Sequence, residues 1–363
     1  MPAADATRCR VAVVADDLSG AADAAAPFAH RGLDVSVALD GPPRPGAQVV
    51  GLVTDNRWRT PEAARQRMLD AVALARAWGP DLLFVKIDST LRGRVRDDVA
   101  TALAAWSPDA PAVATPAFPD QGRTVADGRL AVHGTPHPGR VADRFPDGVE
   151  VLDAVSHADL LAAARAVVDE GRVAVGSGGL ARALAEVLVP EPPERPDRRA
   201  SGNGVLVVAG SPHPATVEQV DRLAEAGALV LGATVDGDAD VAAAAAALDH
   251  GRRVVLAPEP GGVPAADSPE AVLAAGALAT AAVAALDATT RPTGLVLTGG
   301  ATALAVARAL GAHELRLLGE VAVGLPLGEL VTADRRVPVV TKSGGFGVPE
   351  CLLDAAAVLE EHT

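Results

Sequence analysis

Short runs rich in valine, leucine and alanine alternate along the whole chain with longer stretches rich in alanine and leucine. The short runs have the length and composition of buried strands, and the longer stretches are typical of helices. Successive parallel strands need a crossover connection, which is usually a helix. The alternation therefore predicts an α/β protein in which a mainly parallel sheet is flanked by helices.

The expected strands fall into two groups. The first group is Val11–Ala15, Val35–Leu39, Val49–Thr54, Leu82–Ile87, Ala112–Thr115 and Val173–Gly176. The second group is Val205–Ala209, Ala228–Leu231, Val254–Ala257, Leu295–Thr298 and Val337–Lys342, followed by a closing helix from Cys351 to Glu361. Residues 190–204 concentrate proline, charge and glycine without periodicity, as linkers do. We therefore predict an N-terminal domain over 1–189, a linker over 190–204 and a C-terminal domain over 205–363, as a chain of 363 residues allows.

The charge balance excludes some classes of partner. The net charge is −14 and the isoelectric point is near 5.0, whereas nucleic acids and anionic membranes attract clustered lysine and arginine. The start of the chain lacks the apolar core of a signal peptide, and the two cysteines form no metal-binding or redox motif. The apolar run over 271–286 is short for a membrane span and predicts a buried helix. We expect a cytoplasmic protein that binds neither nucleic acid nor membrane.

Two adjacent carboxylates follow the first expected strand. Ligands of open α/β sheets bind beyond the carboxyl ends of strands, so Asp16 and Asp17 lie where a ligand is expected. Such a pair could orient a substrate hydroxyl, accept its proton or hold a metal ion. Asp17 or Ser19 could equally cap the helix that begins near Gly20. Both interpretations stay open at this point.

The fourth expected strand ends in an unusual density of polar residues. Lys86, Asp88, Ser89, Thr90 and Arg92 occur within seven residues, although Ser89 and Thr90 could be helix caps. Of the 32 basic residues in the chain only two are lysines. An ammonium is a compact charge and a guanidinium is a broad planar fork, so a lysine kept against this bias indicates a site that the fork would not fit. Chance is the alternative explanation.

The second of these lysines, Lys342, precedes a glycine-rich segment around Phe346 that could be a phosphate loop, a lid or a simple hairpin. Gly299 and Gly300 stand between a strand and a helix, where glycines let a phosphate approach the backbone N–H groups. A tight structural turn would look the same. Arg57 follows the third strand and could clamp a carboxylate, or it could be an ordinary surface arginine.

Several common enzyme signatures are absent from the sequence. It contains no GxxxxGK[ST] loop, no GxGxxG after the first strand, no GxSxG and no HExxH. These absences weaken interpretations of the chain as an ordinary P-loop nucleotidase, dehydrogenase, serine hydrolase or zinc protease. A phosphatase with Asp16 as nucleophile would be expected to show a DxDxT arrangement, which the chain lacks.

Nine segments in order resemble the four-carbon acid sugar kinase family. They are ADDLSGAADAA, DNR, KIDSTLRG, PAFPDQGRTVADG, GSGGLA, AGSPHPAT, TGGATA, GEVAVGLPLG and KSGGFG, and the match that contains them spans Val11 to Gly347. The resemblance implies an N-terminal domain that binds an acid sugar, a C-terminal domain that binds ATP, and an active site in the cleft between them. Phosphoryl transfer would go to the terminal (4-) hydroxyl of 3-oxo-tetronate, threonate or erythronate. ATP and Mg²⁺ are the implied cofactors, the acid sugar and ATP the implied partners, and a homodimer one option for assembly.

The family's site residues carry over motif by motif. The acid-sugar site is implied at Asp16, Asp17, Arg57, Lys86, Ile87, Asp88 and Ser89, with Asp17 and Lys86 in catalytic roles. The nucleotide site is implied at Ser211, Gly299, Gly300, Ala301, Thr302, Lys342, Gly344 and Gly345. Lys342 is expected either near the phosphates or holding the glycine loop in place. No metal ligands are assigned.

The chain departs from the family pattern in three places: Ser19 replaces a threonine, Ala301 often replaces an acidic residue, and the pair His213-Pro214 is atypical. Whether Asp16 or Asp17 would be the general base stays open. A non-catalytic regulatory protein that binds an acid sugar with the same fold is the alternative function.

Overall fold

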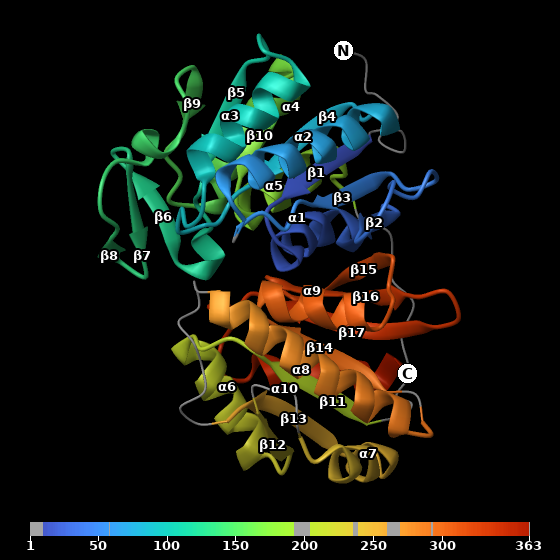
Figure 1. The fold of residues 1–363 in the computed structure, drawn as a ribbon. Helices are drawn as coiled ribbons and strands as arrows, with labels where there is room; N and C mark the ends of the chain where they lie inside the picture. The colour runs from blue at the N-terminus through green and yellow to red at the C-terminus, as the bar shows by residue number, and fades with distance from the viewer. Residues whose placement is uncertain are drawn as a thin grey trace. The chain divides into compact units, whose positions relative to one another are not determined.

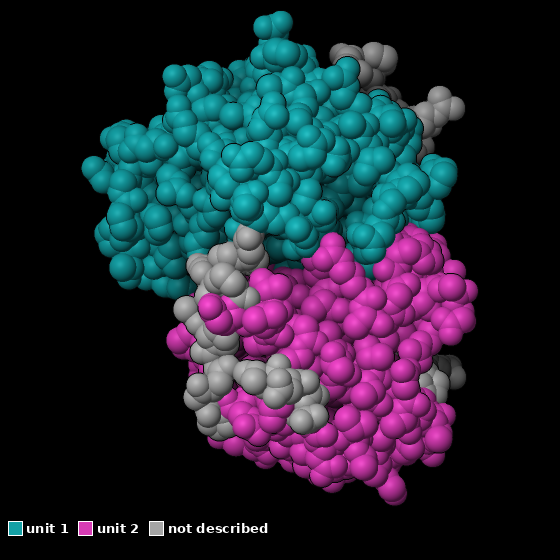
Figure 2. Space-filling model, viewed as in Figure 1, with its two compact units in different colours: residues 1–193 teal, residues 194–363 magenta. Residues whose placement is uncertain are grey.

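The computed structural model describes residues 10–57, 59–191, 204–234, 239–259, 269–291 and 293–362. The chain divides into two compact units, residues 1–193 and 194–363, which Figure 2 shows in different colours. Most of the predicted linker falls on residues 192–203, outside the described residues. The predicted domain limits therefore stay predictions.

Unit 1 contains a parallel sheet of seven strands in the spatial order β2-β3-β1-β4-β10-β5-β9 (Figure 1). Its strands are β1 (Val11–Ala15), β2 (Val35–Ala38), β3 (Val49–Val53), β4 (Leu82–Lys86), β5 (Ala112–Thr115), β9 (Val149–Val151) and β10 (Val173–Gly176). In the shared register Ala15 lies beside both Val53 and Lys86, so β1, β3 and β4 end level with one another. The segments that follow these three strands therefore begin at one edge of the sheet.

Among the described residues of unit 1, five helices cover this sheet: α1 (Leu18–His30), α2 (Pro61–Trp78), α3 (Val95–Trp106), α4 (His157–Glu170) and α5 (Gly178–Leu188). Helix α1 packs against α5, α5 packs against α4, and α2 packs against α3. Every α1 residue from Leu18 to Ala29 is buried, because its alanines let neighbouring elements approach closely. A small antiparallel sheet is formed by β6 (Arg123–Ala126), β7 (Arg129–Val132) and β8 (Thr135–Pro136).

Unit 2 contains a sheet in the order β12-β13-β11-β14-β17-β16-β15. Its strands are β11 (Val205–Ala209), β12 (Leu229–Ala233), β13 (Arg253–Pro258), β14 (Gly294–Thr298), β15 (Glu314–Ala322), β16 (Leu325–Val331) and β17 (Arg336–Lys342). The first five strands in the spatial order are parallel, whereas β16 is antiparallel to β17 and to β15. Thr298 lies beside both Ala209 and Lys342, so β11, β14 and β17 also end level with one another.

The helices of unit 2 are α6 (Pro214–Glu225), α7 (Val241–Asp249), α8 (Pro269–Ala288), α9 (Gly300–Ala309) and α10 (Cys351–His362). The α/β class with mainly parallel sheets is confirmed. Every predicted strand is found with both ends within two residues of the expected ones, and α10 matches the closing helix to within one residue. The short strands β6 to β9 and the hairpin β15–β16 were not predicted, because neither pattern shows the strand–helix alternation.

Helix α8 contains the apolar run that was expected to be a buried helix. Its segment Glu270–Ala288 is, among the described residues, the one stretch long and apolar enough to cross a membrane, and 39% of its most apolar window is buried. It packs against α7, α9 and strands of the sheet, with Leu278 and Ala282 buried and Leu273 72% exposed. The expectation is therefore correct for one face of the helix and wrong for the other.

Candidate functional site

The level ends of β1, β3 and β4 bring three predicted segments of unit 1 together. Arg57, in the loop after β3, reaches both carboxylates that follow β1. Its Nη2 atom lies 2.7 Å from Oδ2 of Asp16, and its Nη1 atom lies 2.9 Å from Oδ2 of Asp17. Its Nε atom also donates to the Asp16 oxygen, at 2.9 Å. Arg57 is therefore a clamp on the two carboxylates and not an ordinary surface arginine.

The electrostatics of this cluster follow from its burial. The Arg57 and Asp16 side chains are only 15% and 13% exposed. Burial raises the pKa of Asp16. The positive charge of Arg57 lowers it, but by less, so the pKa stays above the ordinary value. Burial alone would lower the pKa of Arg57, but Asp16 and Asp17 outweigh it and the pKa is raised. Arg57 stays charged, and Asp16 holds a proton more readily than an ordinary aspartate does.

Asp17 also caps helix α1. Its Oδ1 atom accepts a hydrogen bond of 2.5 Å from the backbone N–H of Gly20, and its Oδ2 atom is the one that faces Arg57. The capping interpretation from the sequence therefore describes Asp17, and both of its oxygens are engaged. Ser19 is buried and is not the cap.

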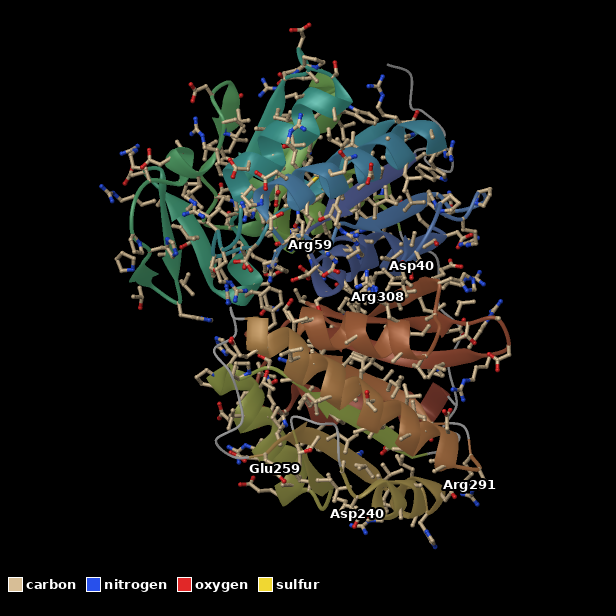
Figure 3. All side chains as sticks on the ribbon, viewed as in Figure 1. Asp40, Arg59, Asp240, Glu259, Arg291 and Arg308 are labelled. Atoms are coloured by element: carbon tan, nitrogen blue, oxygen red, sulfur yellow. The ribbon has the colours of Figure 1, made fainter. Side chains whose placement is uncertain are left out.

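Another arginine of the same loop points elsewhere. Arg59, labelled in Figure 3, pairs with Asp55 at 2.9 Å and donates to the Asp55 carbonyl at 2.7 Å. Asp55 has a φ of 48°, in the left-handed region that is unfavourable for most residues. This internal pair organises the loop and leaves Arg57 as the guanidinium that meets the carboxylates of Asp16 and Asp17.

Lys86, the last residue of β4, lies beneath the first turn of α1. Its side chain is 8% exposed, and Nζ donates to the carbonyl of the buried Ile87 at 3.1 Å. A Cβ atom at Gly20 would lie 3.0 Å from Oδ1 of Asp17 and 3.4 Å from Nζ of Lys86. Glycine at this position therefore leaves room for a carboxylate on one side and an ammonium on the other.

Asp88 closes the KIDSTLRG turn on itself. Its Oδ1 atom accepts from the backbone N–H of Thr90 at 2.9 Å and from the Thr90 hydroxyl, and its Oδ2 atom accepts from Arg92 at 2.6 Å. Burial would raise the pKa of Asp88, but Arg92 and these hydrogen bonds hold it well below the usual range. Asp88 is thus occupied in shaping the turn. Ser89 beside it is buried.

In unit 2 the loops after β11, β14 and β17 meet at the corresponding edge of the sheet. Gly299 is the N-terminal cap of α9 and has a φ of 99°, which glycine adopts without strain. A Cβ atom at Gly344 would lie 2.0 Å from Oγ of Ser211, and one at Gly210 would lie 2.0 Å from Oγ1 of Thr302. Any larger residue at Gly344 or Gly210 would push these loops apart.

Two sets of backbone donors lie in these loops. Gly300 and Ala301 begin α9, where the first N–H groups have no partner within the helix. Within the described parts of the chain, the N–H groups of Gly344 and Gly345 have no protein acceptor either. Unpaired N–H groups at a helix N-terminus and in a glycine loop can bind an anion such as phosphate.

Lys342 holds the glycine loop from beneath. It is completely buried, and Nζ donates to the carbonyls of Ser343, Gly344 and Phe346 at 3.0, 3.1 and 3.0 Å. Burial lowers the pKa of Lys342 to about 8. The three donors of the ammonium are thus directed at carbonyls. Two roles were expected for Lys342, and its geometry fits the one in which it supports the glycine loop. The ammonium has no N–H left to donate to a phosphate.

Two residues that sequence reasoning missed complete this support. Thr216 Oγ1 donates to the Gly344 carbonyl at 2.8 Å, and Gln219 Nε2 donates to the Phe346 carbonyl at 3.0 Å. Both side chains are 1% exposed and lie three residues apart on α6. That spacing on the apolar face of a helix is the signal that could have identified them.

The described residues do not fit a metal site built by the protein alone. They contain no group of three His, Cys, Asp or Glu side chains that could hold an ion. Asp16 and Asp17, the adjacent carboxylates that could have held a metal ion, already bind Arg57.

Comparisons with known proteins identify the family of the chain and two of its domains. Residues 11–144 match the family model of a sugar-binding N-terminal domain, and residues 206–352 match that of a nucleotide-binding C-terminal domain. A D-threonate kinase from Bordetella bronchiseptica is 34% identical, over 97% of this chain and 98% of its own. The chain belongs to the four-carbon acid sugar kinase family.

Other members of the four-carbon acid sugar kinase family are named for different substrates. A 3-oxo-tetronate kinase from Methylobacterium radiotolerans is 31% identical over 92% of this chain and 95% of its own. A crystal structure from Salmonella typhimurium LT2 has a TM-score of 0.73 at 20% identity, covering 96% of this chain and 99% of its own, which shows a shared fold. The family expected from the motifs is confirmed, whereas the site residues carried over with it stay predictions.

One carboxylate behind the Asp16 cluster gives a pH-dependent stability. Asp98 accepts a hydrogen bond of 3.1 Å from Asn56, and burial together with the Asp16 charge raises its pKa to about 7 from 3.8. Because the pKa of Asp98 is higher in the folded protein than in the unfolded chain, the protonated form of Asp98 stabilises the fold. This contribution is complete below about pH 4 and is lost as the pH rises to about 7. Asp98→Asn should therefore raise the free energy of unfolding at pH 8 by about 2 kcal/mol, which raises the melting temperature. At pH 4 the variant should change both quantities little. An equal effect at both pH values in thermal unfolding would contradict this.

Proposed function

We propose that this chain is an ATP-dependent kinase that phosphorylates the terminal (4-) hydroxyl of a four-carbon acid sugar such as threonate, erythronate or 3-oxo-tetronate. The observation that carries the proposal is the buried cluster of Asp16, Asp17, Arg57 and Lys86 at the carboxyl ends of β1, β3 and β4. Curated relatives named as D-threonate, D-erythronate and 3-oxo-tetronate kinases support it.

Lys86 is the cation best suited to meet the acid. The fork of Arg57 is already directed at Asp16 and Asp17, whereas Lys86 makes one hydrogen bond among the described residues, to the Ile87 carbonyl. An ammonium has three donors, so two remain for a carboxylate or a transferring phosphoryl group. Lys86 therefore provides the charge that a small acid needs, while the neighbouring carboxylates can accept hydrogen bonds from its hydroxyls.

Asp16 is the better candidate for the base. Both oxygens of Asp17 are engaged, one with Gly20 and one with Arg57, whereas Asp16 meets Arg57 through Oδ2 alone. The raised pKa of Asp16 makes it a stronger proton acceptor than an ordinary aspartate. In the proposed reaction Asp16 orients the 4-hydroxyl and takes its proton as the oxygen attacks the γ-phosphorus of ATP, and the bond from that phosphorus to the bridging oxygen breaks to release ADP.

Unit 2 would hold the nucleotide through its backbone. The N–H groups at the start of α9 and in the Gly344–Gly345 turn offer donors to phosphate oxygens, and Ser211 lies beside them. Phosphoryl transfer needs mainly positioning and neutralisation of charge, which such donors supply without a covalent intermediate. ATP with Mg²⁺, a homodimer and a cytoplasmic location stay predictions from the sequence.

A substrate panel tests the proposal directly. The protein is incubated with ATP and each of D-threonate, L-threonate, D-erythronate, L-erythronate and their 3-oxo forms, and ADP release is followed with identification of the phosphorylated product. Turnover of at least one four-carbon acid is expected. Calorimetry that shows acid binding without ATP binding would instead favour the non-catalytic regulatory protein, and no turnover with any acid would overturn the kinase.

Lys86→Arg tests whether the compact ammonium matters. The variant keeps the charge but places a broad fork in a space that is 8% exposed, so kcat/KM for the acid should fall at least about tenfold, roughly 1.4 kcal/mol. Arg44→Lys is the matched control, since Arg44 pairs with Asp34 at the start of β2, away from the cluster. Equal kinetics of Lys86→Arg and wild type would mean that only charge is needed.

A further inference from the structure

The buried carboxylate of Asp23 lies beside Lys86 and takes no part in the proposed phosphoryl transfer. Asp23, on α1, is 3% exposed, and its Oδ2 atom lies 3.8 Å from Nζ of Lys86. Its Oδ1 atom accepts no hydrogen bond from any residue that the structure describes. A carboxylate removed from water without hydrogen bonds is unfavourable unless positive charge compensates it, so the surroundings of Asp23 are informative.

The GSGGLA segment supplies part of that compensation. Gly178 is the first residue of α5, and a Cβ atom there would lie 2.3 Å from Oδ2 of Asp23 and 2.7 Å from its Cγ. Glycine therefore lets the carboxylate approach the start of the helix, where the N–H groups carry positive partial charge. Burial raises the pKa of Asp23, and the charges of Lys86 and Arg182 act against that shift.

Lys86 thus lies between two carboxylates. Asp17 is on the side of the acid-sugar site, across the space left open by Gly20, and Asp23 is on the buried side. An ammonium with a single carboxylate neighbour would move toward it. With a second carboxylate fixed behind it, the ammonium is held back from Asp17 and keeps donors for a ligand.

We propose that Asp23 is a positioning residue that holds the Lys86 ammonium in place for the acid sugar. The inference rests on the proposed function in one respect, that Lys86 meets the acid. It assigns a purpose to Gly178 as well, because only a residue without a side chain admits the Asp23 carboxylate at that point. A purely structural Asp23 would affect folding and leave ligand affinity alone.

The test begins with Asp23→Asn, which keeps the shape and removes the charge. Calorimetry with a four-carbon acid that wild type binds should show an affinity about tenfold lower, and the KM for ATP should stay within about twofold. Thermal unfolding measured on the same protein shows whether the variant is folded, so that a loss of acid affinity is not mistaken for a loss of structure. Asp34→Asn is the control, since it removes a carboxylate from the Arg44 pair at the start of β2.

A second pair of variants reaches the same carboxylate from α5. Gly178→Ala would press a methyl group onto Asp23 and should weaken acid binding in the same way. Gly276→Ala is its control, because a Cβ atom at this helical glycine meets nothing within 4 Å. An unchanged acid affinity in a folded Gly178→Ala variant would contradict the inference.

A double-mutant cycle decides whether Asp23 acts through Lys86. In a Lys86→Met background, Asp23→Asn should cause little further loss of acid affinity. An equal loss of acid affinity with and without Lys86 would overturn the inference about Asp23 and leave the proposed function standing. The same holds for an Asp23→Asn protein that binds the acid as wild type does. Wild-type protein that binds no four-carbon acid would overturn the proposed function and this inference with it, so the two failures are distinguishable.

Discussion

Asp16→Asn should lower kcat by about 10²–10⁴ and leave the affinity for the acid sugar nearly unchanged. The side chain keeps its size and its ability to accept a hydrogen bond from Arg57, so the cluster can persist. What is lost is the proton acceptor whose pKa burial raises. Steady-state kinetics of ADP release, with acid affinity measured separately by calorimetry, separates the chemical step from binding.

Asp17→Asn is the matched comparison for this experiment. Asparagine is a good helix cap and can still accept from the Gly20 N–H, so the loss in kcat should be much smaller than in Asp16→Asn. The reverse order of the two variants would identify Asp17 as the base, in line with the catalytic role that the family resemblance implies. Near-normal kcat in both would mean that the two carboxylates serve only the fold.

Lys342→Met should raise the KM for ATP by at least about tenfold while leaving the KM for the acid sugar close to that of wild type. Methionine fills a similar volume but removes the three hydrogen bonds that fix the carbonyls of Ser343, Gly344 and Phe346. Without them the loop can leave the conformation in which the N–H groups of Gly344 and Gly345 have no acceptor among the described residues. The expected loss in unfolding free energy is about 2–4 kcal/mol, since several buried carbonyls lose partners.

Arg336→Met controls for this experiment at the other end of the same strand. Arg336 is exposed and pairs weakly with Glu329 at 3.5 Å, so its replacement should change neither ATP KM nor stability by much. Lys342→Arg should also be damaging, because a guanidinium must enter a position with no exposed surface. A Lys342→Met protein with normal ATP kinetics would contradict the role of loop support.

The class of fold and the family could both be predicted from the amino-acid sequence, whereas the ligand sites at the ends of the strands stay predictions. Parallel strands bury both faces, so runs such as Val11–Ala15 and Val205–Ala209 are apolar throughout and bounded by polar turns, which makes them visible without a structure. The polar residues after those strands could be located for the same reason. The hairpin β15–β16 was not predicted, because its strands follow one another without a helix between them.

The partners of each of these polar residues follow only from the packing of the folded chain. Whether Asp17 is a cap, whether Asp88 is occupied by Arg92, and whether the Lys342 ammonium points at ligand or loop depend on side-chain partners far apart in sequence. Asp23 is the clearest example, since its meeting with Lys86 and Gly178 joins three separate elements. Local sequence fixes which groups are present at the end of a strand, but their free donors and shifted pKa values follow from burial and long-range contacts, which only the packed chain creates.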